Sequence, residues 1–291
     1  MTNGTTFGER LEQAFATRGR LCVGIDPHAW LLDDWGLPDS GAGVREFGLR
    51  VVDAAAGRAG IVKPQVSFFE RHGAAGYAAL ERVLDLARDA GLLVIADVKR
   101  GDIGSTVEAY GQAWLSPGSP LRADAMTIYA YQGLGSIEAV MRQAEDAGAG
   151  LFVVAATSNP EAAAIQQAVL QRSSREGATV AGAIVAGVDA WNRDREGAAG
   201  RAFGSIGVVL GATIAPGDFG IDTSSDSRPG LPVLVPGIGF QGGELRDVPA
   251  RLGALARGAI LTDSRGLLAA GPEGIADAID RRTDEVGALD V

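Results

Sequence analysis

The chain has 291 residues, of which 46% are hydrophobic and 21% are charged, a balance typical of a folded globular protein rather than a disordered one. Its formal net charge of -10 argues against broad binding to nucleic acid or to an anionic membrane. The length suits one large domain covering residues 1–291.

The N-terminal segment carries Phe7, Leu11 and Phe15, whose spacing of four residues predicts a short amphipathic helix. The same segment lacks the apolar core of a secretory signal, and no apolar run in the chain is long enough to span a bilayer. Cys22 is the only cysteine, so an intrachain disulfide is excluded. We therefore expect a cytoplasmic protein that binds neither membrane nor nucleic acid.

Short apolar runs typical of strands alternate with longer helical stretches along almost the whole chain. The predicted strands are Leu21–Ile25, Ile61–Val66, Leu92–Val98, Ala125–Tyr129, Leu151–Thr157, Ile206–Leu210, Pro232–Val235 and Ala259–Leu261, and the clearest helices are Tyr77–Ala90 and Ile137–Ala147. Many of the runs are continuously apolar, as in strands that are covered on both faces. The pattern predicts an α/β protein, a single (β/α)8 TIM barrel with an N-terminal helix.

Two regions fit this alternation less well. Residues 161–203 are too long for one crossover, and we predict a long or broken helix there with a polar loop near Trp191–Gly200. Residues 215–230 are rich in Gly, Pro, Ser and Asp where a sixth helix would be expected. This composition predicts mostly loop.

The segment VIADVKRGDIGST, residues 94–106, is the most informative part of the chain. Side chains at i and i+2 along a strand share a face, so Asp97 and Lys99 should point the same way, at the end of a barrel strand where active sites lie. Asp102 follows after Gly101 lets the chain turn. An isolated Asp-x-Lys would fit a structural ion pair at the barrel rim, but charges beside so apolar a strand are costly unless they pair or meet a ligand.

Two other predicted strands place charge at the same end of the barrel. The first strand ends in Gly-Ile-Asp-Pro, which includes Asp26, and the second carries Lys63 within Ile-Val-Lys-Pro-Gln. We therefore predict that Asp26, Lys63, Asp97 and Lys99 form a network of alternating sign at one pocket, and this favours a catalytic site over a purely structural one.

The last two predicted strands lead into an expected phosphate site. Residues 236–243, PGIGFQGG, contain glycines that let the backbone approach an anion, and the next helix should offer free N–H groups. The final strand leads to Arg265, a planar permanent cation suited to phosphate. Barrels frequently bind phosphate with the loops that follow their seventh and eighth strands.

Gly237, Gly239 and Gly242 also spell G-x-G-x-x-G, and Asp263 lies about 20 residues further on, as in a dinucleotide-binding fingerprint. Fewer than thirty residues follow Asp263, which leaves no room for the rest of a doubly wound sheet. A phosphate grip is the better interpretation.

Together these motifs resemble the orotidine 5'-monophosphate decarboxylase family, in particular its bacterial type 2 branch. The resemblance covers nearly the whole chain through six ordered motifs: Gly-Ile-Asp-Pro at 24–27, Lys-Pro-Gln-Val-Ser-Phe-Phe-Glu at 63–70, Asp-Val-Lys-Arg-Gly-Asp-Ile-Gly-Ser-Thr at 97–106, Ala-Thr-Ser-Asn-Pro at 156–160, Val-Pro-Gly-Ile-Gly at 235–239 and Ser-Arg at 264–265.

The resemblance implies that the chain converts orotidine 5'-monophosphate to UMP and CO2 without a metal or organic cofactor. It implies that Asp97 lies beside the substrate carboxylate and that Lys99 donates the proton that replaces CO2. In that scheme a fixed ammonium at Lys99 would also stabilise the carbanion formed at C6. Lys63 and Asp26 resemble the residues that orient the catalytic charges and bind ribose hydroxyls.

The resemblance also implies roles in binding and assembly. Asp102, with Ile103 and Thr106, resembles the part that reaches into the neighbouring subunit's pocket, so an obligate homodimer is expected. Ser158 resembles the pyrimidine contact. The phosphate grip is expected from Gln241, Gly242, Gly243 and Arg265, although Phe240 is bulkier than the small residue expected in that loop.

Three alternatives stay open. The nearest is a metal-dependent sugar-phosphate keto-acid decarboxylase of the same barrel group, which shares the D-x-K-x-x-D segment but needs further acidic metal ligands. The second is an aldolase that uses Lys63 or Lys99 as a Schiff base. An adjacent Asp97 would keep either lysine protonated, which opposes that role. The third is an inactive nucleotide-binding barrel.

Overall fold

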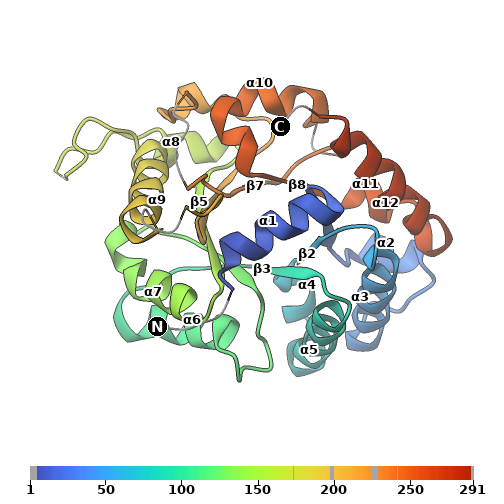
Figure 1. Cartoon of the computed structure of the whole chain (residues 1–291). Coiled ribbons are helices and arrows are strands. Elements are labelled where there is room, and N and C mark those ends of the chain that lie inside the picture. The colour runs from blue at the N-terminus through green and yellow to red at the C-terminus, as the bar shows by residue number, and fades with distance from the viewer. Residues whose placement is uncertain (1–4, 173, 197–199, 225–228, 241, 290–291) are drawn as a thin grey trace.

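The computed structural model describes residues 5–172, 174–196, 200–224, 229–240 and 242–289, and its strands close into a parallel barrel in chain order (Figure 1). The strands are β1 (Leu21–Ile25), β2 (Ile61–Pro64), β3 (Leu93–Arg100), β4 (Ala125–Ile128), β5 (Gly150–Ala156), β6 (Ile206–Leu210), β7 (Val233–Val235) and β8 (Ala259–Asp263). β1 pairs with β8 as well as with β2, which completes the ring. The predicted (β/α)8 barrel is confirmed, with strand bounds that differ from the prediction by at most a few residues.

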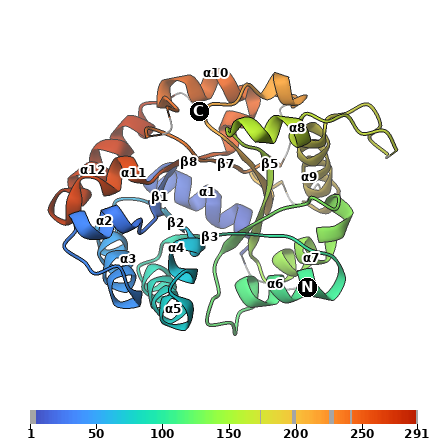
Figure 2. The ribbon, with the colours of Figure 1, turned by 180° about the vertical axis from the view of Figure 1, so that it is seen from behind.

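Helices surround the barrel in both views (Figures 1 and 2). The α-helices are α1 (Phe7–Arg18), α2 (Ala29–Asp34), α3 (Gly41–Ala55), α4 (Val66–Glu70), α5 (Gly73–Asp89), α6 (Gly104–Leu115), α7 (Glu138–Asp146), α8 (Ala163–Gln166), α9 (Val180–Glu196), α10 (Val248–Leu252), α11 (Arg265–Leu268) and α12 (Gly271–Gly287). Short 3-10 turns are η1 (Leu134–Ile137), η2 (Pro160–Ala162), η3 (Pro216–Phe219), η4 (Leu245–Asp247) and η5 (Gly253–Gly258).

The predicted N-terminal helix is confirmed as α1, which lies across one end of the barrel (Figure 1). Thr6 and Glu9 form a reciprocal capping box that satisfies N–H groups at its start. Phe7 and Leu11 are fully buried in a cluster with inward-facing strand residues, and the Phe7 ring meets Phe152 edge to face at 5.8 Å. α1 therefore closes the end of the barrel where the strands begin and leaves the opposite end for a site.

The two irregular regions are explained by their composition. The segment between β5 and β6 is a broken helix, as predicted, formed by α8 and α9 with an irregular stretch between them. The polar loop predicted near Trp191–Gly200 is wrong for its first part, because α9 continues to Glu196, and residues 197–199 lie outside the described residues. After β6, the Gly- and Ser-rich stretch is mostly loop, as predicted, with η3 as its one regular turn among the described residues.

Candidate active site

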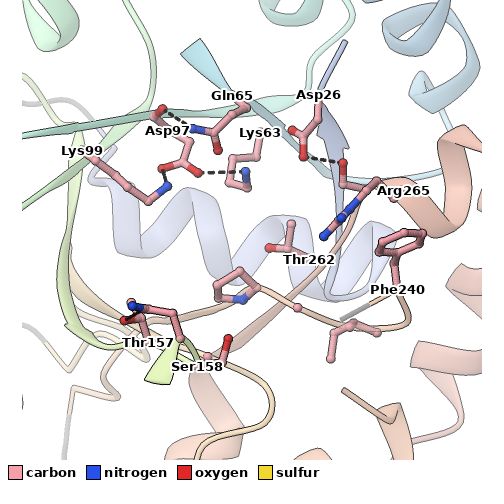
Figure 3. A pocket seen from close by; sticks show the side chains of 16 residues that line it. Asp26, Lys63, Gln65, Asp97, Lys99, Thr157, Ser158, Phe240, Thr262 and Arg265 are labelled. Carbon is pink, nitrogen blue, oxygen red and sulfur yellow. Dashed lines mark hydrogen bonds and ion pairs between the residues drawn. The ribbon is translucent and has the colours of Figure 1, made fainter. Parts of the chain in front are cut away.

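A cavity of about 340 Å³ opens at the C-terminal ends of the strands, opposite α1. Figure 3 shows Asp97, Lys63 and Lys99 on one side of it, Thr157 and Ser158 on another, and Arg265 with Phe240 on a third. The lining residues are Asp26, Lys63, Gln65, Asp97, Lys99, Thr157, Ser158, Asn159, Gly211, Pro236, Gly237, Ile238, Phe240, Thr262, Ser264 and Arg265. The four residues of the predicted charge network do meet in one place.

The Asp97 carboxylate lies between the two lysines of the network. Its Oδ2 accepts a hydrogen bond from Lys63 Nζ at 3.1 Å, and its Oδ1 accepts one from Lys99 Nζ at 2.6 Å (Figure 3). The side chains of Lys63 and Asp97 are only 5% and 6% exposed, whereas that of Lys99 is 35% exposed and reaches the open space. These are the only two lysines in the chain.

Backbone irregularity in β3 places Lys99 in the cavity. Ala96 pairs with Met126 but Arg100 pairs with Ile128, so β3 bulges between these points. Within the bulge Lys99 has a φ of 46°, the one positive value found for a described residue other than glycine. This conformation is strained for a lysine, and strain of this kind is concentrated at functional sites. Lys99 and Asp97 share the cavity as predicted, but through a bulge rather than a regular strand.

Thr127 on β4 stabilises this bulge. Its Oγ1 accepts a hydrogen bond from the Lys99 backbone N–H at 2.9 Å and donates one to Asp97 Oδ1 at 2.8 Å. Because Thr127 is fully buried, neither bond competes with water. The hydroxyl therefore fixes both the strained backbone and the carboxylate to which Lys99 binds.

Burial and mutual attraction act in opposite directions on the pKa values of the three charged groups. Burial alone would raise the pKa of Asp97, but Lys63 and Lys99 together hold it well below 3.8. Burial would lower the pKa of Lys63, but the carboxylates of Asp97 and Asp26 outweigh it and raise that pKa above 10.5. Burial lowers the pKa of Lys99 below 10.5 despite Asp97, and the charge of Lys63 adds to this effect.

Asp26, at the end of β1, is held by Ser264. The Ser264 hydroxyl donates to Asp26 Oδ2 at 2.5 Å, whereas the buried Oδ1 has no hydrogen-bond partner. Gly24 permits this contact, because a Cβ there would lie 2.5 Å from Ser264 Cβ. Asp26 therefore lines the cavity with one carboxylate oxygen held by Ser264 and the other buried without a partner.

Two predicted binding residues lie on the other walls of the cavity. Ser158 follows β5 and is exposed to the cavity. Arg265, at the start of α11, has no carboxylate partner among the described residues, and its guanidinium lies 4.0 Å from the centre of the Phe240 ring. The cavity thus presents three cations and two carboxylates, although the whole chain is acidic.

The glycine loop after β7 differs from the prediction. Its N–H groups bond within the loop, from Gly239 to the Gly243 carbonyl and from Gly243 to the Gly237 carbonyl. The next helical turn, η4, begins at Leu245 and leads into α10, so a helical segment follows these glycines with Glu244 between them. Gly237 lines the cavity whereas Gly242 and Gly243 do not, and Gln241 lies outside the described residues.

Three further predicted residues lie outside this cavity. Asp102, Ile103 and Thr106 follow β3 at the start of α6, and Ile103 is 57% exposed. The Asp102 carboxylate accepts a hydrogen bond from the Ile103 backbone N–H at 2.8 Å. The segment is thus ordered by its own contacts but is not brought to the charge network of its own chain.

Sequence reasoning missed Thr127, Gln65 and Ser264 as parts of the site. Gln65 follows β2 and donates from Nε2 to the Asp97 carbonyl at 3.4 Å. A hydroxyl inside the apolar run Ala-Met-Thr-Ile was the available signal for Thr127, and the rarity of lysine was a signal for the whole cluster.

The described residues contain no group of three or more His, Cys, Asp or Glu side chains placed to hold a metal ion. In the same part of the chain, no helix combines the length and the apolar character needed to cross a membrane.

The fold and the cavity together define a (β/α)8-barrel enzyme with its polar groups at the C-terminal ends of the strands. A sequence model of the family described as "Orotidine 5'-phosphate decarboxylase / HUMPS family" matches residues 19–278. The chain belongs to this family.

Individual relatives agree with this assignment. The chain is 46% identical to orotidine 5'-phosphate decarboxylase of Corynebacterium efficiens over 92% of its own length and 91% of the relative. It is also 46% identical to the enzyme of that name from Nocardioides sp., over 96% and 98% of the two chains. A crystal structure of a candidate orotidine 5'-phosphate decarboxylase from Streptomyces avermitilis superposes with a TM-score of 0.89 at 43% identity, covering 99% of this chain and 96% of the other.

Proposed function

We propose that this chain is a carboxy-lyase that converts orotidine 5'-monophosphate to UMP and CO2, as the names of its relatives indicate for them. The observation that carries the proposal is the Asp97 carboxylate bound by Lys63 and Lys99 in a cavity that also holds Arg265, which has no carboxylate partner among the described residues. The proposal treats residues 1–291 as one decarboxylase domain that acts in the cytoplasm. It assigns the chain no role in binding nucleic acid.

The walls of the cavity suit the three parts of this substrate. Arg265 offers a planar cation to the phosphate, supported by the loop that contains Gly242 and Gly243 and, by the family resemblance, by Gln241. Asp26 lines the cavity and is, by the family resemblance, the proposed partner of the ribose hydroxyls. Ser158 lies across the cavity from the lysines (Figure 3) and is the proposed pyrimidine contact.

Lys99 is the proposed proton donor. Its ammonium is the more exposed of the two lysines, so it can face C6 of the ring while Asp97 and Thr127 hold it in place. As CO2 leaves, this fixed cation stabilises the developing carbanion and then transfers a proton to it. Lys63 lies behind Asp97 and keeps the carboxylate ionised.

Asp97 would then lie close to the carboxylate of the bound substrate. Two like charges at short range repel, and this repulsion is relieved when the substrate carboxylate departs as neutral CO2. Enzymes commonly lower barriers by about 8–23 kcal/mol, so phosphate and ribose contacts must also contribute by closing the site around the ring. The scheme uses no metal or organic cofactor.

A homodimer is part of the proposal. The adjacent ends of β3 and β4 expose Ile103, Tyr129 and Tyr131, which are 57%, 40% and 79% exposed. Large apolar side chains gathered at one rim are typical of an interface. Burial of this rim against a second copy would carry Asp102, Ile103 and Thr106 towards the partner's cavity, as the family resemblance implies.

The test is the change in ultraviolet absorbance when orotidine 5'-monophosphate is added to purified protein, with and without EDTA. We expect conversion that is insensitive to the chelator and is lost in Lys99→Ala. Arg142→Ala, which removes an exposed cation from α7, is the matched control and should convert normally.

Each other outcome points to a different function. Conversion that EDTA abolishes would favour the metal-dependent keto-acid decarboxylase. Borohydride trapping of a lysine adduct would favour the aldolase. If folded wild-type protein binds UMP without turnover, the inactive nucleotide-binding barrel is correct and the proposal fails.

A further inference from the structure

A second cavity, of about 510 Å³, lies at the opposite end of the barrel from the proposed active site. It is bounded by α1 and by the segments that lead into β2, β3 and β4. Four arginines line it, Arg10, Arg18, Arg88 and Arg122, together with a single carboxylate, Asp124. This is a local excess of positive charge on a chain whose net charge is -10.

The carboxylate neutralises only one of these arginines. Asp124 Oδ1 binds Arg10, while Asp124 Oδ2 accepts the Val94 backbone N–H at 2.8 Å. Arg18 donates to the Gly57 carbonyl instead, and Arg88 donates to the Arg122 carbonyl and to Asp85 outside the cavity wall. Bonds to carbonyls hold Arg18 in place without cancelling its charge.

Arg122 is the least engaged of the four. Its side chain makes no hydrogen bond or ion pair with any other residue that the structure describes. It is nevertheless partly buried at the cavity wall, where an uncompensated guanidinium is costly. A group at this position with five donors and no acceptor is suited to an anionic ligand.

Helix ends explain part of this cluster but not all of it. α1 ends at Arg18 and α5 ends at Asp89, so both helices direct their C-terminal ends towards the cavity. Each helix end carries roughly half a negative charge, which favours nearby cations such as Arg18 and Arg88. Two helix ends, Asp124 and the Asp85 partner of Arg88 still leave the four guanidinium groups in excess.

We propose that this cavity binds an oligophosphate, through Arg18, Arg88 and Arg122. Guanidinium groups recognise phosphate through paired hydrogen bonds, and several of them around one cavity favour a chain of phosphates over a single one. The volume lies within the range of small-molecule sites. The lining contains no aromatic side chain, so a nucleoside triphosphate would be held by its phosphates and not by its base.

Titration calorimetry at low ionic strength, with inorganic tripolyphosphate as the probe, tests this site. Arg122→Gln is the main variant, because its side chain has no described partner and its loss should not disturb the fold. We expect it to weaken binding roughly tenfold or more, as for loss of a charge-assisted hydrogen bond. Arg142→Gln, on the outer face of α7, is the matched control and should bind like the wild type.

Two further arms identify where the probe binds and what is recognised. Arg265→Gln alters the other phosphate-binding candidate and should leave tripolyphosphate binding to this cavity intact, so the outcome does not depend on the proposed decarboxylase activity. ATP should bind about as tightly as tripolyphosphate, and adenosine should not bind. Raising the salt concentration should weaken the binding of both tripolyphosphate and ATP.

The proposal is overturned if wild-type protein does not bind tripolyphosphate. It is also overturned if Arg265→Gln abolishes binding while Arg122→Gln does not, because the probe then occupies the active site. If Arg142→Gln weakens tripolyphosphate binding as much as Arg122→Gln does, the binding reflects general surface charge and the proposal is again overturned. An unchanged thermal unfolding midpoint of unliganded Arg122→Gln verifies that the variant is folded.

Discussion

The two ends of the barrel bury different kinds of side chain on the same eight strands. At the end closed by α1, Phe7 and Leu11 fill the interior with apolar contacts that are fully buried. At the other end, Asp97 and Lys63 are nearly as well buried but carry charge. The end closed by α1 gains stability from apolar packing. At the other end, the cost of burying Asp97 and Lys63 is offset because each charge has a partner.

This difference shows that burial alone does not indicate what a residue contributes. Phe7 removes apolar area from water, which stabilises the fold directly. The buried ion pair of Asp97 and Lys63 carries a desolvation penalty that its attraction roughly offsets, so its presence is better explained by chemistry than by stability. The strained backbone of Lys99 supports the same conclusion.

The largest expected effect comes from Asp97→Asn. Activity should fall by about 10²–10³-fold or more, since the fixed electrostatics around Lys99 are lost. Stability at pH 7 should fall by about 3–5 kcal/mol, because Lys63 is left as a buried cation without its main partner. Steady-state kinetics and urea unfolding measure the two effects. As a control, Asp39→Asn, from an exposed pair with Arg71, should leave both activity and stability close to those of the wild type.

The stabilising contribution of Asp97 depends on pH in a defined direction. Because its folded-state pKa is depressed below 3.8, this contribution is complete above that pH and is lost as the pH falls through the folded-state value. The stability gap between wild type and Asp97→Asn should therefore narrow in strong acid. A gap that does not change with pH would contradict the assignment.

Phe7→Ala, at the end of the barrel closed by α1, should lower stability without lowering activity. Loss of a fully buried ring should cost about 3–5 kcal/mol of unfolding free energy, with kcat and KM unchanged at a temperature where the variant is folded. Phe15→Ala, on the same helix but only partly buried, should cost less. A large change in kcat for Phe7→Ala would show that the two ends are coupled.

The decline of kcat/KM at alkaline pH tests the role of Lys99. Burial and the charge of Lys63 lower the pKa of Lys99, and a proton donor must be protonated before it acts. We expect kcat/KM, which reports the free enzyme, to decline with rising pH with a midpoint below 10.5. Circular dichroism at each pH controls for unfolding, and a flat profile up to pH 10.5 would remove Lys99 from the mechanism.

Phe240→Ala carries the smallest expected effect. An exposed cation–π contact contributes about 0.5–1 kcal/mol, so loss of the ring that orients Arg265 should raise KM about 2- to 5-fold and leave kcat unchanged. Phe240→Leu keeps an apolar side chain without an aromatic face and should behave like the alanine variant. If the leucine variant behaves like the wild type, bulk rather than the aromatic face is responsible.

Much of the fold follows from the sequence because the barrel strands are continuous apolar runs of the right length. β1 and β6 begin and end where the hydrophobic pattern predicts. The spacing of Phe7 and Leu11 predicts α1, and the Gly- and Ser-rich composition after β6 predicts loop. The bounds of β3 were less well predicted, because local pattern contains no information about a bulge set by pairing with β4.

The sequence predicted the site residues that interrupt an apolar run with a charge. It was less informative about residues whose place in the site depends on the path of the backbone. Asp26, Lys63, Asp97 and Lys99 each follow or interrupt such a run, and all four reach the cavity. Thr127 escaped notice because a hydroxyl is common in strands and its two partners come from β3. A helical turn does follow Gly243, but the sequence could not show that N–H groups of Gly239, Gly242 and Gly243 bond to carbonyls within the loop itself.

Because Lys63 and Lys99 are the only lysines of the chain, their position in the barrel also determines its sensitivity to lysine-specific proteases. An enzyme that cleaves only after lysine meets two bonds in the whole chain, Lys99–Arg100 in β3 and Lys63–Pro64 in β2, of which the bond to proline resists cleavage. Both bonds belong to barrel strands, so cleavage requires the barrel to open first. The rate of digestion by such a protease therefore reports opening of this barrel, and a ligand that binds only the closed form should slow it in proportion to its occupancy.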